Sequence, residues 1–90
     1  MNKQAILDEM LALLEQNGVI IRKEAFGGGG ASLCKIRGRC TFFVDTEAPI
    51  VEIMEICAKA VAEIVDIDGL YIRPEVRHFI ENQGRQEEGN

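Results

Sequence analysis

Hydrophobic positions recur along the chain at spacings typical of helices and strands. Residues 3–16 predict an amphipathic helix, because their apolar positions follow the i, i+3, i+4, i+7 spacing: Leu7, Met10, Leu11 and Leu14. Asn17 and Gly18 predict the end of this helix, since both residue types tolerate the left-handed conformation beyond a helix terminus. The β-branched residues that begin at Val19 then predict a first strand, which runs to about Ala25.

Residues 32–45 predict a β-hairpin that turns at Arg37, Gly38 and Arg39. A three-residue loop pairs even-numbered with even-numbered positions and gathers one set of residues on a single face: Cys34, Cys40, Phe42 and Val44. The other face then carries Leu33, Lys35, Thr41 and Phe43. A two-residue loop at Arg37 and Gly38 would put Cys34 and Phe42 on opposite faces. Because such a slip carries a buried side chain to solvent, we expect the three-residue loop.

The longest predicted element is a helix over residues 47–65. Asp45 or Thr46 is expected to cap its amides, and Pro49 is tolerated only within its first turn. The apolar residues of this segment form one buried stripe: Ile50, Ile53, Met54, Cys57, Val61, Ile64 and Val65.

The C-terminal third predicts a short extended segment over residues 70–73 and a short last helix that opens at Pro74. Residues 84–90 are polar and are predicted to be a disordered tail. The element order is therefore α-β-β-β-α-(β)-α within one domain of residues 1–83. We expect an α+β fold, in which helices pack on one face of a three-stranded antiparallel sheet.

Charge is distributed unevenly along the 90 residues, whose net charge is −5. Residues 18–44 contain one acid, Glu24, against a set of basic residues: Arg22, Lys23, Lys35, Arg37 and Arg39. Residues 45–68 are strongly acidic. This complementarity predicts a contact with a protein partner, between two copies in a homodimer, or within the chain. The negative net charge disfavours nucleic-acid binding. So does the face that carries Lys35, because it offers only one aromatic residue for stacking on bases.

The N-terminal segment and the cysteine count bear on location. The first sixteen residues contain acids within their apolar stretch and lack a small-residue cleavage site, so they do not predict a signal peptide. No apolar run approaches the roughly 20 residues that span a bilayer. Three cysteines, an odd number, favour reduced thiols. We expect a cytoplasmic protein without a membrane partner.

Four consecutive glycines, Gly27, Gly28, Gly29 and Gly30, precede the basic hairpin. Successive loop amides form anion-binding concavities in some proteins, and Arg37 or Arg39 would add positive charge. However, the run matches no phosphate-loop motif and precedes a strand instead of a helix. The alternatives are a mobile connector between strands and a contact with a ligand or partner.

The candidate metal ligands are Cys34, Cys40, Cys57 and His78, which match a Cys₃His zinc set in number. They contain no CxxC pair, and each cysteine occupies a position that suits a small apolar residue, so a structural role is favoured. His78 is the only histidine, and the sequence nominates neither a nucleophile nor an orienting acid for it. We therefore predict no catalytic residue and no cofactor.

The stretch from Gly18-Val19 through the glycine run resembles a small family of uncharacterised bacterial proteins, together with three later segments: Leu33-Cys34-Lys35-Ile36-Arg37-Gly38, Phe42-Phe43-Val44-Asp45 and Tyr71-Ile72-Arg73-Pro74-Glu75-Val76. This resemblance covers nearly the whole chain and implies an α+β domain without an assigned activity. The element order is also loosely similar to the core of repressor-cleaving zinc metallopeptidases. The corresponding helix here lacks their HExxH motif, so that similarity implies a non-catalytic scaffold.

We therefore predict a non-catalytic interaction or accessory module that is able to self-associate. Its expected contact surface combines the glycine run with the hairpin: Gly27, Gly28, Gly29, Gly30, Lys35, Arg37 and Arg39. The alternatives are a small enzyme of unrecognised type and a Cys/His metal-binding domain.

Overall fold

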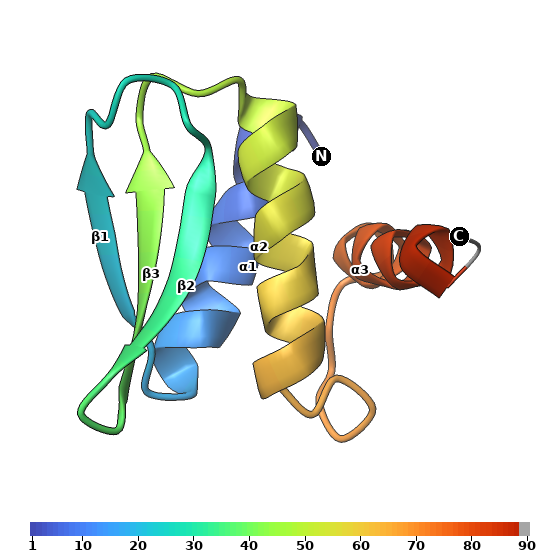
Figure 1. Cartoon of the computed structure of the whole chain (residues 1–90). Coiled ribbons are helices and arrows are strands. Elements are labelled where there is room, and N and C mark those ends of the chain that lie inside the picture. The colour runs from blue at the N-terminus through green and yellow to red at the C-terminus, as the bar shows by residue number, and fades with distance from the viewer. Residues whose placement is uncertain (89–90) are drawn as a thin grey trace.

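Two helices cover one face of a three-stranded sheet, and a third helix packs on the outer side of these two (Figure 1). This computed structural model describes residues 1–88. The elements are α1 (Lys3–Gln16), β1 (Ile20–Glu24), β2 (Ala31–Ile36), β3 (Arg39–Asp45), α2 (Ile50–Ile64) and α3 (Pro74–Glu88). The predicted α+β class and the order of the helices and strands are confirmed. Residues 70–73, predicted as an extended segment, form no strand with the other described residues.

The sheet is mixed, so the prediction of a purely antiparallel sheet is wrong. β3 is the central strand, and it pairs with β2 in antiparallel and with β1 in parallel orientation. The centre suits β3 because Phe42 and Val44 are buried on one of its faces and Thr41, on the other, is only 9% exposed. β1 carries Arg22 and Lys23, and charged side chains are typical of an edge strand.

The hairpin between β2 and β3 turns through two residues, Arg37 and Gly38, and the predicted three-residue loop is wrong. Ile36 pairs with Arg39 across the turn. Arg37 and Gly38 have φ angles of 51° and 79°. Positive φ at both central residues is the type I′ conformation, one of the two-residue turns that follow the right-handed twist of the strands.

This register assigns the side chains to the two faces of the sheet. Leu33 pairs with Phe42 and faces the helices, whereas Cys34 pairs with Thr41 and lies on the face that the helices leave uncovered, here called the open face. The predicted grouping of Cys34 with Phe42 is therefore wrong. Lys35 likewise does not share a face with Phe43.

The segment before α2 differs from the predicted cap. Pro49 occupies the N-cap position without a side-chain hydrogen bond, and α2 begins at Ile50. Proline suits this place because it has no amide hydrogen to donate, and the first amides of a helix have no acceptor within the helix. Asp45, expected to cap the helix, instead accepts a hydrogen bond from the amide of Glu47 at 2.9 Å and closes a turn ahead of it.

The last helix, α3, begins at Pro74 as predicted and extends to Glu88, further than the short helix expected. The glutamine, arginine and glutamate residues that follow Gly84 are good helix formers. Residues 89 and 90 of the predicted disordered tail lie outside the described residues.

The core lies between the sheet and α1 and α2, and α3 closes its far side. Its largest fully buried side chains come from all of these elements: Phe42, Met10, Leu14, Ile80, Val61 and Val76. The predicted apolar stripe of α1 is confirmed, since all four of its residues are buried. In α2, the predicted stripe is buried at its centre and half-buried at Ile50 and Ile64.

Candidate functional site

The tip of the β2–β3 hairpin, residues 35–39, carries three basic side chains: Lys35, Arg37 and Arg39. All three are exposed, and Ile36 among them is 59% exposed. Within the part of the chain that the structure describes, none of the three forms an ion pair, whereas Arg22 pairs with Glu24 at 3.4 Å. The acidic segment of this chain therefore does not neutralise the hairpin tip.

The glycine run lies at the opposite end of β2 from the hairpin tip (Figure 1). β2 is six residues long, and a strand rises by 3.3 to 3.4 Å per residue, so about 20 Å separates the two. The structure thus divides the predicted contact surface into two separate parts.

The backbone of the glycine run forms hydrogen bonds with neighbouring residues of the chain itself. The amide of Gly27 donates to Glu47 Oε1 at 3.0 Å, and the carbonyl of Gly30 accepts from the amide of Asp45 at 2.8 Å. Gly27, Gly28 and Gly30 have φ angles of 89°, 91° and 105°, which other residue types rarely adopt. These contacts tie the loop to the end of β3 and leave fewer amides for an external anion.

Asp45 lies at the centre of this loop and is only 1% exposed. Its Oδ1 atom accepts hydrogen bonds from the amides of Phe26, at 3.0 Å, and Glu47. Its Oδ2 atom is buried and has no hydrogen-bond partner among the described residues. Burial acts to raise the pKa of Asp45, but the amides of Phe26, Glu47, Gly28 and Gly29 outweigh it and hold that pKa below its ordinary value. Asp45 is therefore ionised at neutral pH.

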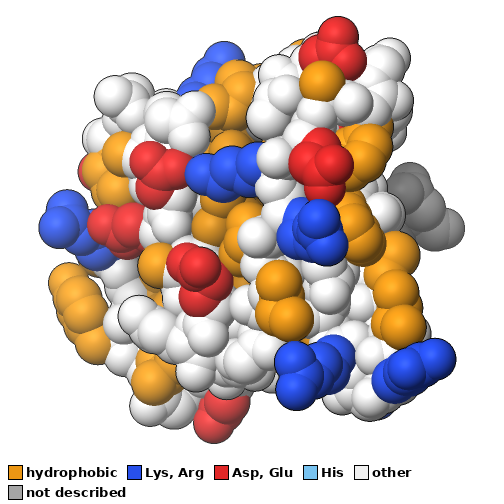
Figure 2. All heavy atoms as spheres, turned by 90° about the vertical axis from the view of Figure 1, so that its left-hand side faces the viewer, with side chains coloured by type: hydrophobic (Ala, Val, Ile, Leu, Met, Phe, Trp, Pro, Cys, Tyr) orange, Lys and Arg blue, Asp and Glu red, His pale blue; other side chains and the backbone are white. Residues whose placement is uncertain are grey.

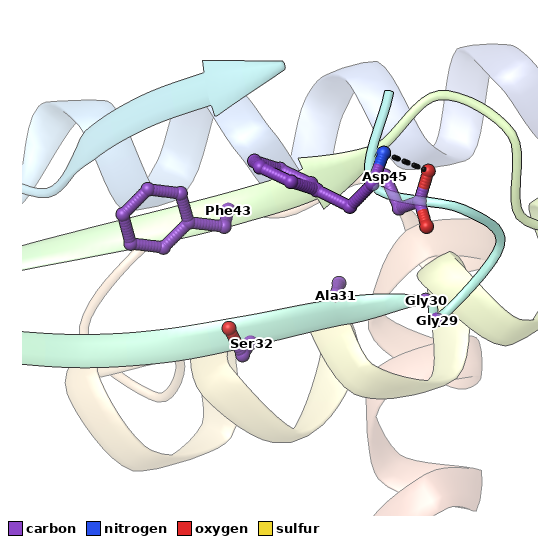
Figure 3. Close-up of a pocket in the computed structure, with 7 residues that line it drawn as sticks. Gly29, Gly30, Ala31, Ser32, Phe43 and Asp45 are labelled. Atoms are coloured by element: carbon purple, nitrogen blue, oxygen red, sulfur yellow. Dashed lines mark hydrogen bonds between the residues drawn. The ribbon is translucent and has the colours of Figure 1, made fainter. Parts of the chain in front are cut away.

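A pocket of about 280 Å³ lies beside this carboxylate, between residues 29–32 and two aromatic rings (Figure 3). The rings of Phe26 and Phe43 meet edge to face, with centroids 6.1 Å apart and planes at 77°. Phe26 is 50% exposed, and Phe43 projects from the open face of the sheet. The pocket therefore combines an aromatic wall with one buried negative charge.

The side of the molecule on which β1 lies exposes no continuous apolar surface (Figure 2). Hydrophobic side chains form several separate groups there, and charged side chains of both signs lie between them. Ile20 of β1 is 44% exposed. A partner on this side would have to match charges as well as apolar groups.

The four candidate metal ligands do not come together. Cys57 is fully buried in the core, where burial raises the pKa of its thiol to about 12. Cys34 and Cys40 lie on opposite faces of the hairpin, and His78 is on α3 with its Nε2 atom 3.0 Å from the side chain of Asn82. No three His, Cys, Asp or Glu residues of the described chain are placed to hold a metal ion.

The sequence analysis did not identify Phe26 and Asp45 as site residues. A faint signal existed, because an aspartate at the end of an apolar strand is costly to bury without donors, and the glycine run is a source of amides.

None of the helices that the structure describes is long and apolar enough to cross a membrane.

Comparisons with known proteins leave the family open. No family model, no curated protein and no solved structure matches the chain significantly. The resemblance to uncharacterised bacterial proteins and the loose similarity to zinc metallopeptidases therefore stay predictions.

Proposed function

We propose that the chain is a non-catalytic interaction module that binds an acidic protein surface through its hairpin tip. One observation carries the proposal: Lys35, Arg37 and Arg39 are exposed around Ile36 and form no ion pair within the described chain. Arginine is enriched at the centres of protein interfaces, and an apolar side chain amid the charges adds area to bury.

The electrostatics of the whole chain support an acidic partner. The net charge is −5, so the basic tip is a local exception on an acidic molecule. An acidic partner would be repelled by most of the surface and attracted at the tip, which favours one orientation of approach. Binding of this kind weakens as the salt concentration rises.

One acidic partner covered by the proposal is a second copy of the same chain. α2 presents Glu52 and Glu63 to solvent, with Glu55 half-exposed. The tip of one copy and α2 of another have opposite charges, as a self-associating contact requires. Static light scattering of the purified chain distinguishes this form, because a strict monomer at micromolar concentration excludes it.

The pocket favours binding over catalysis. Asp45 is the only side chain lining it that ionises; Ser32 supplies its one hydroxyl, and no histidine lines the pocket to activate that hydroxyl as a base. General acid–base chemistry in this pocket would have to rely on Asp45 alone, because its lining offers no second ionisable side chain. The proposal also places the protein in the cytoplasm, where its three free cysteines would stay reduced.

The test is charge reversal at the tip with a matched control. Arg37→Glu combined with Arg39→Glu changes the net charge as much as Lys3→Glu combined with Lys23→Glu. All four residues are exposed, and the two control residues lie outside both the hairpin tip and α2. Each tagged variant is used to capture partners from the native cell, and its melting temperature is measured in parallel.

We expect the tip variant to lose its captured partner at an almost unchanged melting temperature, and the control pair to retain it. Capture that survives the tip reversal would contradict the proposal. Equal loss in both pairs would show that only the net charge matters, and would contradict it too.

A further inference from the structure

We propose that the pocket beside Asp45 binds an alkylguanidinium or alkylammonium group, as carried by an arginine side chain, a lysine side chain or a small amine. This site lies at the other end of the strands from the hairpin tip, so the inference is independent of the proposed interaction (Figure 1). It rests on an unpaired buried carboxylate oxygen, a pair of aromatic rings and the negative charge of the site.

The first observation is the missing partner of Asp45 Oδ2. Oδ1 already accepts two backbone hydrogen bonds, from Phe26 and Glu47, whereas the buried Oδ2 accepts none of good geometry. The amides of Gly28 and Gly29 act on the carboxylate and help to lower its pKa, but they complete no hydrogen bond to Oδ2. A buried acceptor without a well-aligned donor has replaced its water hydrogen bonds only in part, which is unfavourable. A donor from a ligand would remove this cost, and a cationic donor would do so most strongly because Asp45 is ionised.

The glycine loop covers Oδ2, so a ligand reaches it only if the loop shifts. The structure leaves room for that movement. A Cβ atom built at Gly29 would meet nothing within 4 Å, and one built at Gly28 would meet only the carbonyl of Glu47, at 4.0 Å. Open space therefore lies beside these two residues where a Cβ atom would be, although their amides act on the Asp45 carboxylate.

The aromatic wall suits the same ligand. A guanidinium or ammonium group is attracted to the face of a phenylalanine ring, and its methylene stem packs against the ring carbons. Phe26 and Phe43 meet edge to face, so one ring contacts the other only through its edge (Figure 3). The faces of that ring are therefore not covered by its aromatic neighbour and can meet a cation. The pocket volume of about 280 Å³ lies at the small end of ligand sites, which suits one side chain more than a nucleotide.

Charge argues against an anion in this pocket. Asp45 contributes a full negative charge, and the pocket lining contains no lysine, arginine or histidine. The amide of Gly27, which would be part of an anion-binding loop, donates to Glu47. A phosphate would thus meet repulsion at a place where its expected donors are already occupied.

The experiment is a titration of the full ¹⁵N-labelled chain with butylguanidinium, butylammonium and the neutral isostere butylurea, followed by amide chemical shifts. Potassium chloride controls for ionic strength. A capped Gly-Arg-Gly peptide forms a further arm: tighter binding than butylguanidinium identifies a peptide side chain as the ligand, and equal or weaker binding identifies a small free cation. We expect saturable shifts at Phe26, Gly29, Gly30, Ser32 and Phe43, with butylurea weaker by about tenfold or more.

Two variants test the assignment to this pocket. Asp45→Asn keeps an acceptor for the Phe26 and Glu47 amides but removes the charge, and we expect it to abolish the preference for butylguanidinium over butylurea. Phe43→Leu keeps an apolar side chain without a ring and should weaken both cations even if Asp45→Asn fails to fold. Absence of saturable shifts, equal binding of butylurea, shifts confined to the acidic α2, or unchanged binding in these variants would each overturn the proposal.

Discussion

The carboxylate of Asp45, the last residue of β3, accepts a hydrogen bond from the backbone amide of Phe26 at 3.0 Å. Phe26 lies two residues beyond β1, so this bond joins the ends of two parallel strands. The same oxygen accepts from Glu47, on the segment that leads into α2. One buried side chain therefore holds together a sheet edge, the glycine run and the approach to a helix.

This arrangement makes the stability of the fold sensitive to acid. The pKa of Asp45 in the folded chain lies below its ordinary value of 3.8, because backbone amides more than offset the effect of burial. On acidification the unfolded chain takes up this proton first, so the free energy of unfolding falls as the pH drops through the folded pKa. We expect the urea midpoint to be steady between about pH 7 and pH 5 and to decline below about pH 4.

Asp45→Asn is the matched control for this effect. It cannot ionise, so its urea midpoint should be lower than that of the parent chain at neutral pH and should fall less on acidification. Parallel pH profiles for the two proteins would mean that other carboxylates cause the acid sensitivity.

The register of the hairpin predicts different costs for two neighbouring truncations. Leu33 is half-buried and packs against the core, whereas Cys34 lies on the open face. We expect Leu33→Ala to lower the free energy of unfolding by about 2 kcal/mol and Cys34→Ala to change it by less than about 0.5 kcal/mol. Urea denaturation of both variants measures this, and the reverse order would indicate the three-residue register.

The hairpin shows where sequence reasoning succeeded and where it failed. The alternation of apolar residues identified both strands and the burial of Phe42 and Val44, because burial on one face imposes a period of two. It could not fix the offset between the strands. Cys34 looks apolar in a sequence, so it was grouped with Phe42, whereas the turn conformation of Arg37 and Gly38 decides the register.

Strand order was beyond the sequence for a different reason. Each strand's own pattern reports which face is buried but not which strand lies beside it. The connection through the glycine run is long enough to let β1 pair with β3 instead of β2. The apolar β3 buries more of its side chains at the centre of the sheet than it would at an edge. The pocket was missed for the same reason, because Phe26, Phe43 and Asp45 come together only once β1 and β3 are neighbours.

Gly38 and Gly29 offer a direct test of the turn. A Cβ atom at either position would meet nothing within 4 Å, but only Gly38 has a positive φ, at 79°. We expect Gly38→Ala to destabilise the fold by about 1 kcal/mol through backbone strain alone. Gly29→Ala should stay within about 0.5 kcal/mol of the parent. Equal urea midpoints for the two variants would contradict the two-residue turn.

The three cysteines should differ sharply in reactivity. Cys57 is fully buried, and its pKa of about 12 leaves almost no thiolate, which is the reactive form, at about pH 8. Cys34 and Cys40 are only half-buried on the hairpin. Mass spectrometry after treatment of the native chain with a thiol reagent should show these two modified first, with Cys57 following only as the core opens or in urea. Cys57→Ala should lose the slow step and keep the two fast ones. Rapid modification of Cys57 in the native chain would mean that α2 separates readily from the sheet, contrary to the packing seen here.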